Sequence, residues 1–131
     1  SNFNITKCAI KNMITNKYGK ITYISSMWGK VGASCESVYS ASKGALNTFA
    51  LSLAKELGPS NINVNVVCPG LIDTKMNNNL SPDAVKEVVS STPLNRIGKP
   101  VDCANLVEFL ISEKASFITG QIITIDGGFS L

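Results

Sequence analysis

Three short runs of β-branched and apolar residues, separated by longer stretches with helical periodicity, most constrain the fold of this chain. The runs are KITYIS at 20–25, INVNVVC at 62–68 and QIITID at 121–126, and their composition favours β-strands. Outside these runs, apolar residues recur every three to four positions, which is typical of amphipathic helices. Strands that alternate with helices predict parallel βαβ units, in which helices cover both faces of one sheet.

Four helices are expected from the apolar spacing and from the residues that begin or end helices. They cover residues 2–17, 37–57, about 82–91 and about 100–112. Gly58-Pro59 ends the long second helix. The segment 26–36 is expected to be a loop, and Asn77-Asn78-Asn79 disfavours a stable helix in the polar stretch that contains it.

The expected sheet is small for its kind. Three strands are few, yet the runs ITYI and VNVV are apolar enough to be buried on both faces, as in the middle of a larger parallel sheet. The first strand would then have an unpaired edge. Since 131 residues suffice for one domain, we expect residues 1–131 to form the C-terminal part of a doubly wound α/β fold.

Composition argues against several classes of partner. The hydrophobic content of 44% and the charged content of 16% are those of a soluble globular protein. The net charge is +3 and the lysines form no basic run, so nucleic-acid binding is not expected. No apolar run is long enough to cross a bilayer and no signal peptide is evident, so we expect a cytoplasmic protein without a membrane partner.

The cysteines argue against a metal site. Cys8, Cys35, Cys68 and Cys103 are far apart, no CxxC pair occurs and the chain has no histidine, so no zinc site is expected. The lack of histidine also excludes mechanisms in which histidine activates a serine or cysteine nucleophile. Cys8, Cys68 and Cys103 fall among apolar residues, and we expect them to be buried, reduced thiols.

Ser26, Tyr39 and Lys43 form a candidate proton-transfer site. Ser26 follows the first strand, whereas Tyr39 and Lys43 lie four residues apart on one face of the long helix. A tyrosine in water has a pKa near about 10, which is too high for a base at neutral pH. A cation within a few ångströms stabilises the phenolate and lowers that pKa. Ser26 would supply the hydroxyl that orients a substrate carbonyl.

Each of these features also has a structural interpretation. Tyr39 and Lys43 alone are compatible with a solvated pair on a helix surface, and Ser25 competes with Ser26 for the role of the functional serine. Pro69-Gly70 would merely end the second strand.

Three further features allow more than one interpretation. Met27 and Trp28 would line a substrate pocket or cover the core. Arg96 would contact a phosphate or form a surface ion pair. The sequence Asp126-Gly127-Gly128 favours a tight structural turn over a catalytic role, because glycine adopts backbone conformations that other residues avoid.

Five motifs, in order, resemble those of the short-chain dehydrogenases/reductases. They are GKITYISS, YSASK, NVNVVCPGLIDTKM, PLNRIGKPVDCANLVEFLIS and ITGQIITIDGG. The resemblance runs in register along essentially the whole chain, and Tyr39 follows Ser26 by the thirteen residues expected in that family. The last two motifs are most similar to those of 3-oxoacyl-acyl-carrier-protein reductases and glucose dehydrogenases. The resemblance implies the C-terminal half of a Rossmann-type domain, with the catalytic and substrate-loop portion.

The resemblance implies a catalytic role for three residues. Tyr39 would be the acid/base, which gives a proton to the carbonyl oxygen in reduction and takes it back in oxidation. Lys43 would lower the pKa of that tyrosine and hydrogen-bond the nicotinamide ribose, so that both residues also contact the cofactor. Ser26 would hold and polarise the substrate carbonyl.

The resemblance also implies a cofactor-binding loop after the second strand. Pro69, Gly70 and Ile72 would lie along the nicotinamide of NAD or NADP, with the Ile72 backbone meeting the carboxamide. Thr74 would reach towards the carboxamide or the pyrophosphate. The segment from 71 to about 94 would be a mobile lid that selects the substrate.

Several parts of the family pattern do not occur in these 131 residues. They include the TGxxxGxG-like phosphate loop, the residue that sorts NAD from NADP, the NAG-like segment and the catalytic asparagine, a role that neither Asn2 nor Asn4 fills.

The resemblance therefore covers about half of a complete member, which in this family is usually a dimer or tetramer. It implies NAD(P)-dependent interconversion of a ketone and a secondary alcohol, most similar to 3-oxoacyl-acyl-carrier-protein reduction. The alternative is a truncated, inactive fragment that serves at most as an association partner.

Overall fold

The computed structural model of the chain describes residues 2–77 and 80–131, which contain a three-stranded parallel sheet. The strands are β1 (Gly19–Ile24), β2 (Ile62–Pro69) and β3 (Ile122–Ile125), in the order β1-β2-β3. Each strand begins and ends within one residue of the sequence run that predicted it. The predicted parallel α/β sheet is confirmed, with β2 paired on both sides.

The four predicted helices are present, and a fifth was missed. They are α1 (Asn2–Asn16), α3 (Ser37–Leu57), α4 (Pro82–Ser91) and α5 (Pro100–Ile111). The missed helix is α2 (Trp28–Val31), a single turn inside the segment predicted to be a loop. One turn is too short to show apolar periodicity. Of the three asparagines, Asn77 ends a short 3₁₀ turn, whereas Asn78 and Asn79 lie outside the described residues.

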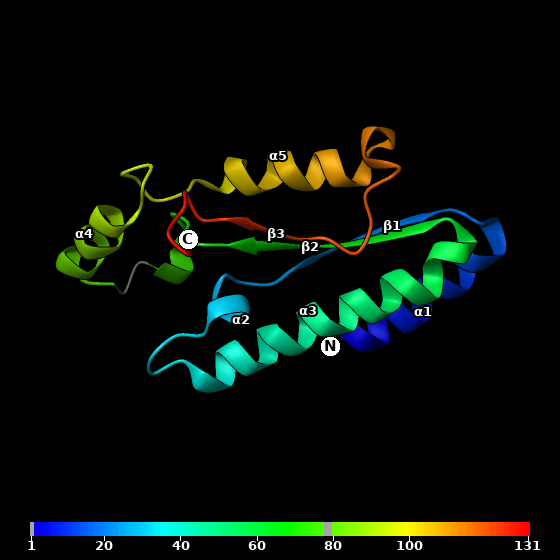
Figure 1. Cartoon of the computed structure of the whole chain (residues 1–131), viewed down its shortest axis with the longest axis horizontal. Helices are drawn as coiled ribbons and strands as arrows, with labels where there is room; N and C mark the ends of the chain where they lie inside the picture. Colours follow the sequence, from blue (N-terminus) through cyan, green and yellow to red (C-terminus); the bar gives the residue numbers. More distant parts are fainter. Residues whose placement is uncertain (1, 78–79) are drawn as a thin grey trace.

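Helices cover both faces of the sheet (Figure 1), with α1 and α3 on one face and α5 on the other. Alternation along β2 supplies a core for each face. Val64, Val66 and Cys68 pack with the α3 side chains, whereas Val67 packs with Leu110 of α5. These β2 residues are almost completely buried, as expected for the central strand of a parallel sheet.

The β1 side of the described sheet is an edge, and two predictions fail there. Ile24 is 48% exposed, so the run ITYI is not buried on both faces as VNVV is. Cys8 of α1 is exposed, whereas Cys68 is buried as predicted and Cys103 is half-buried. The reason is that α1 is covered by the sheet and α3 on one side only, and Cys8 lies on its other side with Ile5, beside an open hollow. None of the described helices is both long enough and apolar enough to cross a membrane.

Candidate active site

Backbone hydrogen bonds continue beyond the carboxyl ends of the strands and fix the segments that carry the candidate residues. The Met27 amide donates to the Pro69 carbonyl at 3.0 Å, and the Gly70 amide donates to the Ile125 carbonyl at 2.8 Å. The segment after β1 therefore lies beside the end of β2, and the segment after β2 lies beside the end of β3. This edge, where parallel strands end, is the usual ligand-binding edge of an open α/β sheet.

The helix that carries Tyr39 is tied to the serine segment by close backbone packing. The Ser25 hydroxyl donates to the Lys43 carbonyl at 3.1 Å, and the Asn47 amide donates to the Gly29 carbonyl at 3.1 Å. A Cβ on Gly29 would lie 2.7 Å from the Lys43 backbone carbon, which is closer than real Cβ contacts. Glycine at this position therefore lets α2 lie directly against α3.

These contacts distinguish the two competing serines. Both serines are buried, and the Ser25 hydroxyl is used in the bond to the Lys43 carbonyl. The Ser26 oxygen accepts a hydrogen bond from the Trp28 amide at 3.2 Å, which leaves its hydroxyl hydrogen available to a ligand. Ser26 also lines a cavity together with Tyr39. The Ser26 hydroxyl thus lies on the cavity wall, whereas the Ser25 hydroxyl is bonded to α3, and the functional role of Ser26 stays a prediction.

Tyr39 and Lys43 are neighbours on α3, as their spacing predicts. The Lys43 ammonium lies 5.6 Å from the centroid of the Tyr39 ring, and it donates a hydrogen bond to the Ile24 carbonyl at 3.2 Å. Tyr39 is 37% exposed and lines a cavity with Ser26. The lysine is thus held between the end of β1 and the tyrosine ring, with further N–H donors on its ammonium.

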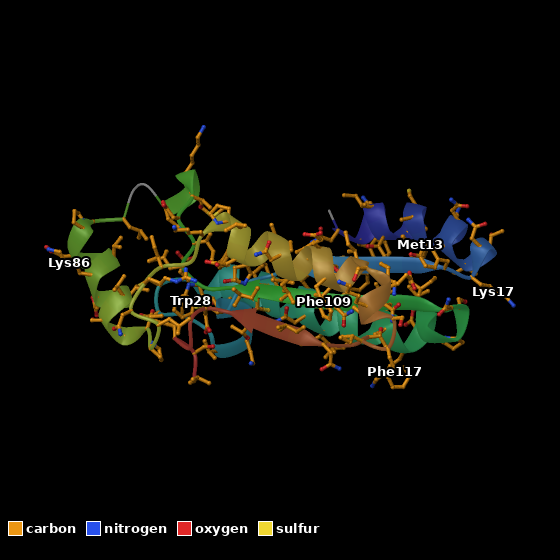
Figure 2. The ribbon with its side chains drawn as sticks, turned by 90° about the horizontal axis from the view of Figure 1, so that it is seen from above. Met13, Lys17, Trp28, Lys86, Phe109 and Phe117 are labelled. Atoms are coloured by element: carbon orange, nitrogen blue, oxygen red, sulfur yellow. The ribbon has the colours of Figure 1, made fainter. Side chains whose placement is uncertain are left out.

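The cavity that contains Ser26 and Tyr39 has a volume of about 540 Å³. Gly70 contributes to it from the segment after β2. The two residues with an open interpretation, Met27 and Trp28, both line it, although Met27 is also buried. Trp28 contacts Phe129 edge to face, with ring centroids 5.7 Å apart. Figure 2 shows Trp28 towards the end of the molecule that carries Lys86 of α4, opposite the end that carries Lys17.

The segment after β2 supplies the other wall of the cavity. The lining residues from this segment are Leu71, Met76, Asn77, Leu80 and Val88, which fall within the predicted lid. Figure 1 shows α4 beyond the carboxyl ends of β2 and β3, where such a lid would lie.

Among the predicted cofactor-loop residues, the described cavity includes Gly70 and not Pro69, Ile72 or Thr74. Ile72 is buried and pairs with Gly98, and its carbonyl accepts a hydrogen bond from the Asn77 side chain at 2.6 Å. Thr74 is exposed. The structure therefore brings Ser26, Tyr39 and Gly70 to one cavity, with Lys43 beside the tyrosine. The loop assignments remain predictions.

Arg96 and Asp126, for which the sequence allowed a functional or a structural interpretation, both make structural contacts. Arg96 forms an ion pair with Asp102 at 2.8 Å, and this guanidinium, with the Lys99 amide, holds the pKa of the Asp102 carboxyl below its ordinary value. Asp126 accepts hydrogen bonds from the Gly128 amide at 3.0 Å and the Ser130 amide at 2.9 Å. The prediction of a structural turn at Asp126 is confirmed.

One lining residue was missed by sequence reasoning. Glu36 precedes α3 and lines the cavity with Tyr39. No sequence signal pointed to it, because Glu36 is the N-cap residue of α3 and lies outside the helical spacing that pairs Tyr39 with Lys43.

Comparisons with known proteins identify the family of the chain. A family model described as enoyl-(acyl carrier protein) reductase matches residues 1–130. The chain is 46% identical over 129 residues to the uncharacterized oxidoreductase YmfI of Bacillus subtilis (strain 168), a match that covers 98% of this chain and 53% of that protein. It is 44% identical over 126 residues to the 3-oxoacyl-[acyl-carrier-protein] reductase FabG of Buchnera aphidicola subsp. Baizongia pistaciae, covering 96% of this chain and 51% of that one.

A solved structure is similar over the same region. It is a 3-oxoacyl-[acyl-carrier protein] reductase with bound NAD from Brucella melitensis, with a TM-score of 0.89 and 35% identity over 98% of this chain and 47% of that chain. The chain thus spans about half the length of the curated relatives it matches. The predicted fold, part of a larger Rossmann-type parallel sheet, is confirmed. Because the family model and these relatives match it from end to end, the chain belongs to the short-chain dehydrogenase/reductase family.

Proposed function

We propose that residues 1–131 are the catalytic half of an NAD(P)-dependent reductase that interconverts a ketone and a secondary alcohol. The observation that carries the proposal is the cavity of about 540 Å³ at the carboxyl ends of the strands, which Ser26 and Tyr39 both line. The name of the Buchnera relative supports a 3-oxoacyl thioester as the substrate of the complete protein.

In the proposed mechanism, the chain orients the substrate and moves one proton. The Ser26 hydroxyl donates a hydrogen bond to the substrate carbonyl, which withdraws electron density from the carbonyl carbon. The Tyr39 hydroxyl transfers its proton to the carbonyl oxygen as the alcohol forms. Lys43, beside the tyrosine ring, favours the resulting phenolate because of its positive charge. In the oxidative direction the same phenolate removes the proton of the alcohol.

The residues present fit the nicotinamide end of a dinucleotide cofactor. Lys43 has three N–H donors, of which the Ile24 carbonyl accepts one, so it retains donors for ribose hydroxyls. Pro69, Gly70, Ile72 and Thr74 would hold the nicotinamide at the end of β2. When bound, the cofactor supplies the hydride that the carbonyl carbon accepts. Both NAD and NADP remain candidates, and the bound NAD of the Brucella structure supports this class of cofactor.

We expect the 131-residue chain alone to show little or no turnover. Hydride transfer requires the cofactor to be fixed against the carbonyl, and a glycine-rich loop at a helix N-terminus normally supplies much of that binding through the pyrophosphate. The competing function is an inactive fragment that serves only in association. If the dinucleotide-binding half is supplied, the proposed reductase would gain turnover, whereas an inactive fragment would not.

The test of the proposed function uses a completed enzyme. We define this as the chain preceded by a dinucleotide-binding half, taken from its own gene if the reading frame extends upstream and otherwise from the Bacillus relative. We expect it to oxidise NADH or NADPH when a 3-oxoacyl thioester is added, as followed by nicotinamide absorbance. A completed enzyme that binds the reduced cofactor but reduces neither this thioester nor simple ketones would contradict the proposal.

The two serines provide a second prediction. We expect Ser26→Ala to lower kcat of the completed enzyme by about 10²-fold, because a hydrogen-bond donor to the carbonyl oxygen is lost. Ser25→Ala removes the bond to the Lys43 carbonyl, so we expect about 1 kcal/mol less stability and a much smaller loss of kcat. Steady-state kinetics and denaturant unfolding of both variants measure this. The opposite ranking of kcat would assign the catalytic role to Ser25.

We further propose that the completed enzyme is a homo-oligomer of the cytoplasm. Ala41 and Ala45 on α3 are exposed, and small side chains on an outer helix face allow a second helix to pack closely. Sedimentation of the completed enzyme would show its oligomeric state.

A further inference from the structure

The indole ring of Trp28 forms part of the cavity wall and contacts a second aromatic ring outside it. Trp28 lines the cavity together with Ser26 and Tyr39. Its ring meets that of Phe129 at an angle of 83°, with the ring centroids 5.7 Å apart. Aromatic pairs favour this edge-to-face arrangement, which contributes more than the buried area alone. Phe129 is not among the described residues that line the cavity, so it acts on the cavity through Trp28.

The backbone that carries Trp28 is held in place by other contacts. The Trp28 amide donates to the Ser26 hydroxyl oxygen at 3.2 Å, and the next residue, Gly29, packs directly against the Lys43 backbone. The freedom that remains is that of the Trp28 side chain. The position of its ring is therefore decided by the side chains around it, and Phe129 is one of them.

Phe129 belongs to a turn after β3 that has a defined conformation. The Asp126 carboxylate accepts hydrogen bonds from the Gly128 amide at 3.0 Å and from the Ser130 amide at 2.9 Å. These two bonds flank Phe129 on both sides along the chain. The turn therefore fixes the backbone from which the phenyl ring reaches Trp28.

The same turn contacts the end of the predicted lid, which runs from 71 to about 94. The Leu94 amide donates to the Gly127 carbonyl at 3.2 Å. A Cβ on Gly127 would lie 2.7 Å from the Thr92 methyl carbon, which is closer than real Cβ contacts. Figure 1 shows the turn, in red, at the carboxyl ends of the strands. The turn thus joins the aromatic ring of one wall to the segment that carries the other.

The cavity wall suits an aliphatic chain. Most of the lining side chains are apolar, namely Met27, Trp28, Leu71, Met76, Leu80 and Val88. Met76 is 82% exposed and Leu80 is 42% exposed, so an apolar ligand that covers them would remove apolar surface from water. The volume of about 540 Å³ is within the usual range of small-molecule pockets. The cavity therefore has room for more than the reacting carbonyl.

We propose that Phe129 is a positioning residue that holds the Trp28 ring on the cavity wall, and that this ring selects 3-oxoacyl groups with an apolar tail of several carbons over shorter ones. This inference rests on the proposed function, since the tail reaches the wall only when Ser26 and Tyr39 hold the carbonyl. Each methylene that is fully removed from water improves binding about fourfold. The tail of a 3-oxobutanoyl group is a single methyl beside the carbonyl and gains little from this wall.

Two thioester probes isolate the effect of tail length. They are the 3-oxobutanoyl and 3-oxooctanoyl thioesters of N-acetylcysteamine, which share the thioester and the reacting carbonyl. We expect the completed enzyme to show a kcat/KM about tenfold higher for the octanoyl probe, because part of the longer tail is removed from water. The tail takes no part in bond making, so the difference should fall mainly in KM.

Variants at the two rings test the proposal. Phe129→Ala removes the ring that contacts Trp28, and we expect it to lower the octanoyl-to-butanoyl ratio of kcat/KM about fivefold. Trp28→Ala removes the wall itself and should bring the ratio close to one. Phe129→Leu keeps most of the apolar volume in the turn and should lower the ratio by a smaller factor, so it tests the proposal even if the alanine variant does not fold.

Phe117→Ala is the matched control. Phe117 is fully exposed and lines a different hollow, with Gly58 and Asn61. It lies far from Trp28 in Figure 2. We expect this variant to leave the ratio unchanged. Melting temperatures of all variants check that each is folded.

The emission of Trp28 provides a second measurement, which a loss of stability alone would not change. Trp28 is the only tryptophan in the 131 residues, and a Trp28→Phe enzyme supplies the emission of any tryptophan in the other half. After subtraction, we expect acrylamide to quench Trp28 more strongly in Phe129→Ala, because the indole ring loses its contact with the phenyl ring.

The outcomes separate this inference from the proposed function. If folded Phe129 variants keep the ratio and the quenching of the unchanged enzyme, Phe129 does not position Trp28. If both probes are reduced with equal kcat/KM, or if Trp28→Ala keeps the preference, the ring does not select the tail, although the enzyme is a reductase of 3-oxoacyl thioesters. If the cofactor-binding enzyme reduces neither probe nor a simple ketone, the proposed function fails and this inference with it.

Discussion

Replacing Tyr39 with phenylalanine is expected to lower kcat of the completed enzyme by about 10²–10⁴-fold, the usual contribution of a positioned acid/base. The ring and its contact with the Lys43 ammonium remain in this variant, whereas the hydroxyl proposed to give its proton to the carbonyl oxygen is lost. Binding of NADH or NADPH, measured by nicotinamide fluorescence, should therefore change little while turnover is lost. Single-turnover measurements at saturating cofactor would separate the two effects.

Tyr18→Phe is the matched control for this variant. Tyr18 is 52% exposed, and its hydroxyl donates to the Glu113 carboxylate at 2.9 Å, next to the Lys17 end of the molecule. Removing that hydroxyl breaks a surface hydrogen bond and should leave kcat unaltered. A Tyr39→Phe enzyme as active as Tyr18→Phe would remove Tyr39 from the role of acid/base.

Leu110→Ala is expected to cause the largest loss of stability among single truncations on α5, about 2–5 kcal/mol of unfolding free energy. Leu110 is 1% exposed and packs with Val67 of β2 and with Ala115, so its removal leaves a cavity between helix and sheet. Denaturant unfolding of the completed enzyme, followed by circular dichroism, measures the loss. The midpoint should shift without a change in the slope of the transition.

The next residue on the helix serves as the comparison. Ile111 is 48% exposed, so Ile111→Ala removes fewer buried contacts and should cost clearly less than Leu110→Ala. Equal losses at the two positions would mean that α5 does not pack on the sheet through Leu110.

The strands and the Tyr39–Lys43 pair could be predicted because their signals are local patterns in the sequence. Each predicted strand is present. The run VNVV predicted burial on both faces, and β2 is buried between α3 and α5. The spacing of Tyr39 and Lys43 predicted neighbours because four residues make about one helical turn. The choice of Ser26 over Ser25 was open in the sequence and stays a prediction, and the structure adds that the Ser25 hydroxyl donates to the Lys43 carbonyl.

The remainder depended on tertiary contacts that leave no periodic signal. The turn α2 exists because Gly29 packs against the backbone of α3, more than ten residues away. Cys8 lies among apolar residues and was predicted to be buried, yet the described residues cover α1 on one side only. The sequence did not predict that Glu36 lines the cavity, and only the structure shows this position.

The packing of α2 on α3 has a consequence for how enzymes of this kind diversify. The Ser25–Lys43 and Asn47–Gly29 hydrogen bonds set the distance between the serine and the tyrosine without using the intervening residues 32–36. Substitutions in that stretch would alter the wall of the cavity at Glu36 while Ser26 and Tyr39 keep their relative positions. After gene duplication, a descendant would acquire a new substrate by a few changes there and inherit its chemistry intact.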